Sequence, residues 1–151
     1  MDSNDKIKTV GINVKEKANL IWNVANTLFG AYKPHEYGLV ILPMAVIKRF
    51  HDCLLPTQDK VVETYQKVKQ LAVKDGFLRS ASGYHFYNTS NYNFEKLKAD
   101  PENIKTNFET YINGFSDNII DILANMGFYT QIERMADAGV LYQVICDFCS
   151  D

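Results

Sequence analysis

Hydrophobic residues recur at helical spacing along most of the chain, and this period predicts a mostly α-helical fold. The first apolar stripe has members three, four and seven positions apart: Ala18, Ile21, Trp22, Ala25, Leu28 and Phe29. This spacing places them on one face of a helix, which we expect to turn toward the core. Asn13 and Glu16 fit a capping box at the start of that helix, and Gly30 is suited to end it.

The second predicted helix, over residues 37–54, is apolar on nearly every side before Lys48 and Arg49. A helix without a polar face is typical of a buried position, so we expect this one at the centre of the domain. Pro34 stands where the helix would begin, and Pro43 inside it predicts a kink because proline lacks a backbone donor. A third, amphipathic helix starts near residue 61 and is expected to stop before Gly76.

Residues 77–93 interrupt the helical pattern with aromatic, Asn and Ser residues, and they predict a structured loop that includes a short strand at residues 84–87. Helical spacing then returns to the end of the chain, with Thr130 and Glu133 as a further capping box. The expected fold is therefore a compact bundle of about seven or eight helices. We expect a polar tail over residues 1–13 and a single helical domain over residues 14–151.

Composition agrees with one compact domain, since the 151 residues are 46% hydrophobic and suffice for a core. Three cysteines are too few for a disulfide-stapled secreted scaffold and fit a reducing compartment. The longest apolar run covers residues 39–47, far short of the ~20 residues that span a bilayer. The acid-containing N-terminus does not fit a signal peptide. We expect a soluble, cytoplasmic protein without a membrane partner.

Charge is distributed unevenly along the chain, although the net charge is only −2. Residues 60–79 hold five Lys or Arg and two acids, whereas residues 106–151 hold one Arg and seven acids. Proteins that depend on phosphate contacts usually carry a basic excess, which the whole chain lacks. The basic stretch fits either a solvated helix face or a patch that meets nucleic acid or a partner, and both interpretations stay open.

The motifs that suggest catalysis each lack part of what the chemistry needs. Cys146-x-x-Cys149 lies inside an apolar-periodic helix, whereas a thioredoxin-like pair needs a helix N-terminus after a strand. Zinc needs about four ligands in paired sets. The remaining candidates are scattered: His35, His51, Cys53 and His85. His51-Asp52-Cys53 are neighbours that a helix points in different directions, and no glycine-rich phosphate loop occurs. We expect no catalytic, cofactor-binding or metal-binding residue in this chain.

The remaining function that the side chains suggest is the binding of nucleic acid, a ligand or a partner. The rings of residues 84–92 could stack on nucleobases, or they could simply pin the loop to the core. His85 in this loop could touch a ligand. The candidates for contacts with DNA or a partner are Lys33, Lys48, Arg49, Lys67, Lys69, Arg79, Tyr84, Phe86, Tyr87, Asn88 and Asn91.

Six blocks of sequence, taken in order, carry a family resemblance. They are LIWNVANTLFG at 20–30, YKPHEYGxVILP at 32–43, FYNTS at 86–90, FEKL at 94–97, DPENI at 100–104 and YINGFS at 111–116. The ordered set resembles the N-terminal region of the modification (M) subunit of type I restriction–modification systems. The resemblance covers the chain from about residue 18 to residue 148.

The resemblance implies a role within a larger enzyme. The full subunit of this family methylates the N6 atom of adenine in double-stranded DNA with S-adenosylmethionine. It works with a specificity subunit, a second modification subunit and a restriction subunit in the bacterial or archaeal cytoplasm. Its N-terminal region is a helical domain that helps to close around DNA and contacts neighbouring subunits.

The chain also departs from the full subunit of that family. It contains no Asn-Pro-Pro-aromatic motif, no glycine-bearing cofactor loop and no alternation of strands and helices. We therefore expect a domain that transfers no methyl group itself, with the methyltransferase domain following residue 151. The alternative is a stand-alone helical protein-interaction module without a DNA role, which docks through its acidic C-terminal third at Asp117 or Asp121.

Overall fold

The predicted helical bundle is confirmed. The computed structural model describes the backbone of residues 3–149 and the side chains of residues 14–149. Within this range, regular structure is helical, and the only β-type pairings are isolated bridges between Phe29 and Tyr32 and between Asn88 and Phe115. The α-helices are α1 (Ser3–Leu28), α2 (Gly38–Leu54), α3 (Gln58–Val68), α4 (Asp75–Ser82), α5 (Phe94–Lys98), α6 (Ile104–Asn113), α7 (Asp117–Asn125), α8 (Phe128–Asp137) and α9 (Leu141–Cys149). Three 3-10 turns are η1 (Pro34–Glu36), η2 (Leu55–Thr57) and η3 (Pro101–Asn103).

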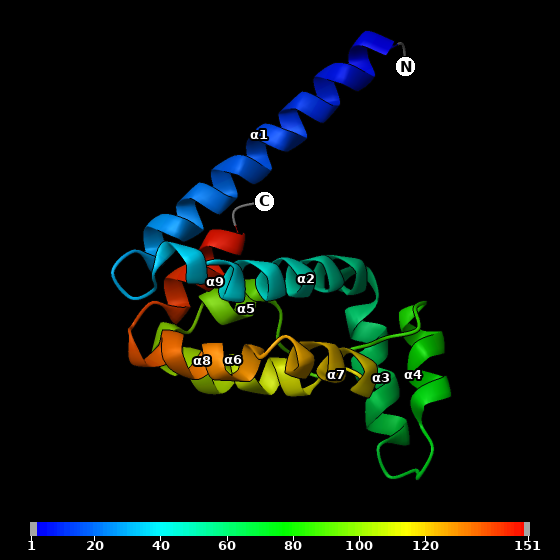
Figure 1. The fold of residues 1–151 in the computed structure, drawn as a ribbon. Helices are drawn as coiled ribbons and strands as arrows, with labels where there is room; N and C mark the ends of the chain where they lie inside the picture. The colour runs from blue at the N-terminus through cyan, green and yellow to red at the C-terminus, as the bar shows by residue number, and fades with distance from the viewer. Residues whose placement is uncertain (1–2, 150–151) are drawn as a thin grey trace.

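The last helix, α9, occupies the centre of the bundle. It packs against α1, α2, α5, α6 and α8. Its buried side chains, Leu141, Val144, Ile145 and Phe148, are spaced so that they form one apolar face. Figure 1 shows α6, α7 and α8 in a layer beneath α2, and α1 rising away from the body toward the N-terminus.

The first helix is longer than predicted and turns a different face to the core. It begins at Ser3, so Asn13 lies inside it rather than capping it, because no proline interrupts residues 3–28. Its buried positions are Val24 and Leu28. Most of the predicted stripe is uncovered: Ala18, Ile21, Trp22 and Phe29 are exposed. The prediction of the inward face was therefore wrong, because α1 meets α9 through a neighbouring row of side chains.

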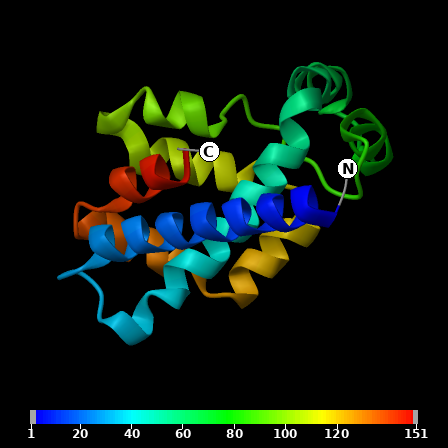
Figure 2. The same cartoon turned by 90° about the horizontal axis from the view of Figure 1, so that it is seen from above.

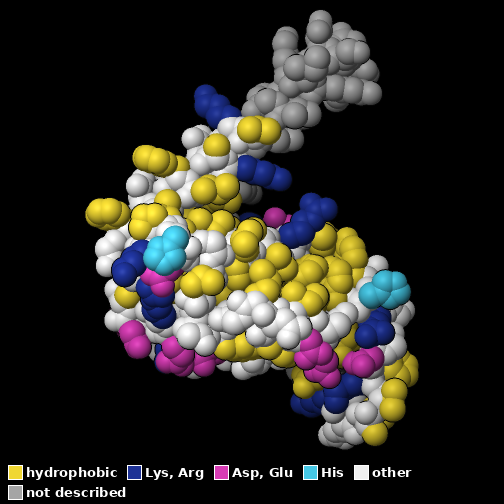
Figure 3. Space-filling view, viewed as in Figure 1, with side chains coloured by type: hydrophobic (Ala, Val, Ile, Leu, Met, Phe, Trp, Pro, Cys, Tyr) yellow, Lys and Arg dark blue, Asp and Glu magenta, His cyan; other side chains and the backbone are white. Residues whose placement is uncertain are grey.

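The prediction that the second helix is central was also wrong. α2 buries Val40, Met44 and Ile47 on one side. Leu39 and Leu42 on the other side are exposed, because α9 takes the central position instead. The predicted proline does lie within the helix, at the buried position Pro43. Figure 3 shows hydrophobic side chains spread over the outer face of α2.

The hairpin of α3 and α4 forms a second, smaller unit with its own core. Its buried residues are Val61, Val68, Leu78, Ala81 and Tyr87. The predicted third helix ends at Val68, and α4 covers residues 75–82, so it takes up the first six residues of the predicted loop at 77–93. Gly83 ends α4 with a φ of 82°, a left-handed conformation that glycine adopts without steric cost. Figure 2 shows α1 crossing over α2, and the α3–α4 hairpin at the far end of α2.

Two smaller predictions differ from the structure. α8 begins at Phe128, directly after Gly127, so Thr130 lies in its first turn and does not cap it. Residues 84–87 form no strand, because their backbone is held by a side chain instead: Ser82 Oγ donates to the Phe86 carbonyl at 2.8 Å and accepts from the Tyr84 N–H at 3.1 Å. The aromatic segment is thus a loop from residue 83 onward.

Candidate functional site

The structure distributes the candidate contact residues over three places. Lys67, Lys69, Arg79, Tyr84 and Phe86 lie on the α3–α4 hairpin and the loop after it. Lys33, Lys48 and Arg49 lie on α2 and the segment before it. Tyr87, Asn88 and Asn91 lie in the loop that leads to α5.

One shallow hollow brings three of these residues together. It has a volume of about 590 Å³ and is lined by Arg79, Ser80, Gly83, Tyr84, His85 and Phe86. The Tyr84 and Phe86 rings lie 5.1 Å apart at 30°, and Phe86 packs against Phe50 at 4.7 Å. The Arg79 guanidinium and the Tyr84 ring are both exposed. A cation beside an exposed ring can contact a phosphate, a base or an acidic partner.

The hairpin carries further exposed cations near the C-terminal end of α3. Lys67 pairs with Glu63 at 3.3 Å, and Lys69 donates to Gln66 at 3.0 Å. Because the Lys67 pair is largely exposed at both ends, it contributes little to stability and is easily exchanged for another anion. Figure 3 shows Lys and Arg side chains next to hydrophobic ones at this end of the molecule.

The candidates on α2 and before it differ in what they already contact. The Lys48 ammonium donates to Asp52 at 3.0 Å and lies 5.5 Å from the centre of the Phe94 ring. Lys33 is exposed. Arg49 is exposed and forms no salt bridge with any described side chain. Lys48 therefore serves the packing of α2, while Lys33 and Arg49 present their charge to solvent.

Two candidates of the loop are buried inside the domain. The Tyr87 hydroxyl is hydrogen-bonded to the Asp75 carboxylate, which ties the loop to α4. Asn88 Nδ2 donates to the Tyr111 carbonyl at 2.8 Å, and Asn88 Oδ1 accepts from the Ser90 N–H at 2.8 Å. Tyr87 and Asn88 hold the loop in place rather than present a surface. Asn91 is exposed.

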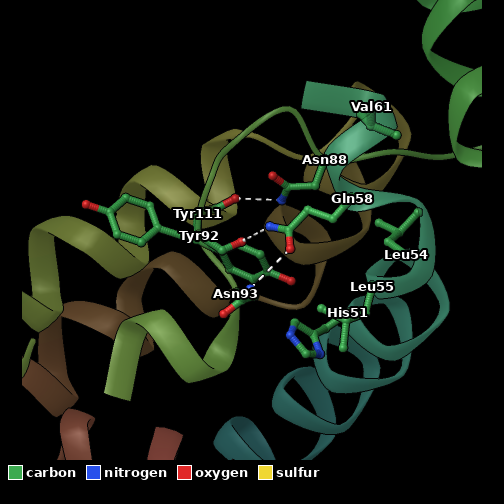
Figure 4. A pocket seen from close by; sticks show the side chains of 9 residues that line it. All are labelled: His51, Leu54, Leu55, Gln58, Val61, Asn88, Tyr92, Asn93 and Tyr111. Carbon is green, nitrogen blue, oxygen red and sulfur yellow. Dashed lines mark hydrogen bonds between the residues drawn. The ribbon is translucent and has the colours of Figure 1, made fainter. Parts of the chain in front are cut away.

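A small pocket lies where this loop meets α2, and Figure 4 shows its polar lining. Gln58 donates to the Tyr92 carbonyl at 2.9 Å and accepts from Asn93 Nδ2 at 3.1 Å. The pocket has a volume of about 20 Å³. A space of that size suits a single water molecule, so we assign the pocket a structural role.

His51, which lines this pocket, is hydrogen-bonded through both ring nitrogens, to α5 on one side and to its neighbour Asp52 on α2 on the other. Its Nε2 accepts from the Phe94 N–H at 3.2 Å, which places the proton of the neutral ring on Nδ1. That Nδ1–H donates to Asp52 Oδ1 at 2.9 Å. Burial lowers the pKa of His51 and favours the neutral ring. No ring nitrogen is left to activate Cys53.

The cysteine pair lies inside α9 rather than at a helix N-terminus after a strand, and the surroundings of Cys149 do not favour a thiolate. Burial raises the pKa of the Cys149 thiol, whereas a reactive thiol needs a lowered pKa. Among the residues whose side chains the structure describes, no group of three or more His, Cys, Asp or Glu could hold a metal ion. In the same part of the chain, no helix has the length and apolarity needed to cross a membrane.

A groove between α1 and α2 was not predicted from the sequence. It has a volume of about 380 Å³. We call it the α1–α2 groove; its lining is Lys17, Leu20, Ile21, Ile41, Leu42, Ala45, Lys48, Arg49, Asp52 and Phe148. The sequence feature that indicates it is the second predicted helix. This helix is apolar on nearly every side, but the rest of the fold buries only one of those sides.

Comparison with known proteins agrees with the sequence blocks. The chain matches no curated protein and no solved structure at a significant level. The family model described as HsdM N-terminal domain matches residues 17–148, which extend from the second half of α1 almost to the end of α9. Most of the chain is covered by this match, and so is every block that carries the resemblance. The chain belongs to the HsdM N-terminal domain family, the N-terminal domain of modification subunits in type I restriction–modification systems.

Proposed function

We propose that this domain helps its methyltransferase subunit to close on double-stranded DNA through the α3–α4 hairpin and takes part in subunit assembly. The parent subunit transfers a methyl group from S-adenosylmethionine to adenine N6. Its partners are a specificity subunit, a second modification subunit and a restriction subunit in a prokaryotic cytoplasm. The domain itself contributes contacts with DNA and with other subunits rather than a catalytic step.

The observation that carries the DNA contact is the concentration of cations on the hairpin. Residues 58–82 hold five Lys or Arg and three acids, whereas the chain as a whole holds 16 and 18. Each cation that neutralises a phosphate releases a bound counterion, which favours association at moderate salt. Arg79, one of these cations, is exposed in the last turn of α4, and the exposed Tyr84 ring lies just after this helix.

The hairpin's separate core supports the same proposal. Because Val61, Val68 and Leu78 pack within the hairpin, its outer side chains can contact a ligand without disturbing the main bundle. Figure 1 shows the hairpin at one edge of the molecule, below the level of α2. A projecting basic edge suits a domain that closes against a duplex.

We also propose that S-adenosylmethionine binds outside this domain. The pocket beside His51 holds about 20 Å³, whereas sites for drug-sized ligands and cofactors enclose roughly 300–1,000 Å³. The larger hollows are open to solvent, and no glycine-rich loop borders them. These features support our proposal that the cofactor binds to another part of the subunit.

Charge reversal in the assembled methyltransferase tests the DNA contact. The variant Lys67→Glu/Lys69→Glu should weaken DNA binding and lower the slope of log K against log salt by about one for each lost phosphate contact. The matched control is Lys96→Glu/Lys98→Glu, which reverses two exposed lysines with the same spacing on α5. The measurement is DNA affinity by fluorescence anisotropy over a salt series.

Circular dichroism on both variants verifies that the fold is retained. If the hairpin variant keeps the wild-type affinity and salt slope, the hairpin does not contact DNA. That result would favour the alternative of a protein-interaction module without a DNA role.

A further inference from the structure

Two apolar helix faces border the α1–α2 groove without covering each other. On α1, Ile21 is 50% exposed; on α2, Leu42 is 62% exposed. Both side chains line the groove, and Phe148 of α9 borders it as well. Exposed Leu and Ile side chains that face one another across a hollow gain free energy when apolar groups fill the space between them.

The charges around the groove are mainly positive. Lys17 stands on α1, and Lys48 and Arg49 stand on α2. Asp52 is the acid among the lining residues, and it is already bonded to Lys48 at 3.0 Å. Lys17 and Arg49 form no salt bridge within the part of the chain whose side chains are described. The groove therefore offers two unneutralised cations beside an apolar floor.

We propose that the α1–α2 groove binds an acidic amphipathic helix from a different subunit of the restriction–modification complex. This inference rests on the assembly half of the proposed function. A helix fits because two helices form the walls, and a third helix can pack its apolar ridge between them. The walls offer no strand edge, so an added strand would leave its backbone groups unpaired.

The chemistry of the occupant follows from the lining. Leu or Ile anchors spaced three and four positions apart would meet Ile21 and Leu42. Asp or Glu beside those anchors would pair with Lys17 and Arg49. DNA would match the cations but would gain nothing from the apolar floor, so a protein helix fits better than a duplex.

Photo-cross-linking in the assembled complex tests this proposal. The photoreactive residue benzoylphenylalanine replaces Leu42 in the full-length modification subunit. The control places it at Leu39, which is also on α2 and 43% exposed but does not line the groove. The expected result is a cross-link from position 42, absent from position 39, to a helical peptide of a different subunit that combines apolar and acidic residues. A cross-link to DNA, to a second copy of this subunit or to the same subunit overturns the proposal, as does no cross-link.

Substitutions in the groove give a second, independent measurement. Leu42→Asp should weaken subunit association roughly tenfold, the size expected for one interface anchor, while Leu39→Asp should not. Arg49→Glu should also weaken it, and exchanging the cross-linked acid for Arg in the partner should restore it. Equal behaviour of Leu42→Asp and Leu39→Asp would contradict the proposal.

These association measurements are made without DNA and leave the hairpin lysines unchanged. A negative result in these association measurements would therefore contradict only the proposal for the groove. A failure of the salt-slope experiment concerns the hairpin alone.

Discussion

Gly114 lies after α6, where the loop of residues 88–90 passes close to the main bundle. A Cβ placed on Gly114 would lie 2.6 Å from Asn88 Oδ1 and 3.0 Å from the Ser90 nitrogen. Neither atom can retreat freely, since Asn88 is buried and bonded to Tyr111. The Thr89 N–H also donates to the Gly114 carbonyl at 2.8 Å. Glycine at this position is thus required by close approach.

We predict that Gly114→Ala destabilises the domain by about 1–3 kcal/mol, the usual cost of overpacking. The matched control is Gly76→Ala in α4, where a Cβ would meet nothing within 4 Å. Alanine favours the helix there, so the control should be neutral or stabilising by about 0.5–1 kcal/mol. Urea unfolding measures both changes. Equal destabilisation by the two variants would show that close approach is not the cause.

Arg134 and Glu36 connect α8 to η1 at the residue scale. The Arg134 guanidinium donates to Glu36 at 2.8 and 3.0 Å and lies over the Tyr32 ring at 3.8 Å. These bonds, with a further one from the Lys33 N–H, hold the pKa of Glu36 at about 2, below its ordinary 4.5. The carboxylate is thus favoured in the folded state.

The pH dependence of this pair follows from the lowered pKa. Its stabilising effect is fully present above about pH 4.5 and disappears as the pH falls toward about 2. We predict that Glu36→Gln is less stable than wild type at pH 6 and that the difference shrinks by pH 3. Urea unfolding at both pH values measures it. The control is Glu102→Gln, an exposed acid that forms no ion pair with a side chain of residues 14–149. A Glu36→Gln deficit that stays constant with pH would contradict the assignment.

At the scale of elements, the α3–α4 hairpin should open independently of the main bundle, because it has its own core. The Tyr87 hydroxyl joins the loop to Asp75 at the start of α4. We predict that Tyr87→Phe costs about 1 kcal/mol and speeds hydrogen exchange about fivefold in residues 58–82 only. Mass-spectrometric exchange resolves the two regions.

Tyr32→Phe provides the matched control for the hairpin. It removes a buried hydrogen bond of 2.8 Å to Gln131, which joins the α1–α2 connection to α8. Its effect should appear in the main bundle and not in the hairpin. A uniform rise in exchange in the Tyr87→Phe variant would mean that the domain opens as one unit.

Elements were predictable where the local pattern decides the structure. The period of apolar residues identifies α5 to α9, and glycine after residue 29 stops α1. α4 was missed because its eight residues bury only Leu78, Ala81 and Ser82, too short a pattern to distinguish from a loop. The face of α1 was misassigned because Val24 and Ile21 are equally apolar. Which of these two side chains is buried depends only on the position of α9 against α1.

At the scale of the whole molecule, the candidate surfaces were only partly predictable. Counting charges along the sequence identified the hairpin lysines, because residues that are close in sequence within one hairpin are also close in space. The aromatic and Asn-rich loop composition also selected Tyr87 and Asn88, which are buried against partners distant in sequence, Asp75 and Tyr111. The excess apolar surface of the second helix was visible in the sequence, but the position of the α1–α2 groove was not, since it arises only where two helices and α9 meet.

The length of α1 has a geometric consequence for the assembled enzyme. A helix of 26 residues measures about 39 Å, since each residue adds about 1.5 Å. If this rod pivots by roughly 10° near Leu28, its other end travels about 7 Å, more than one helical turn of about 5.4 Å. A rigid helix of this length would therefore convert a small change of angle at its base into a displacement of several ångströms at its other end.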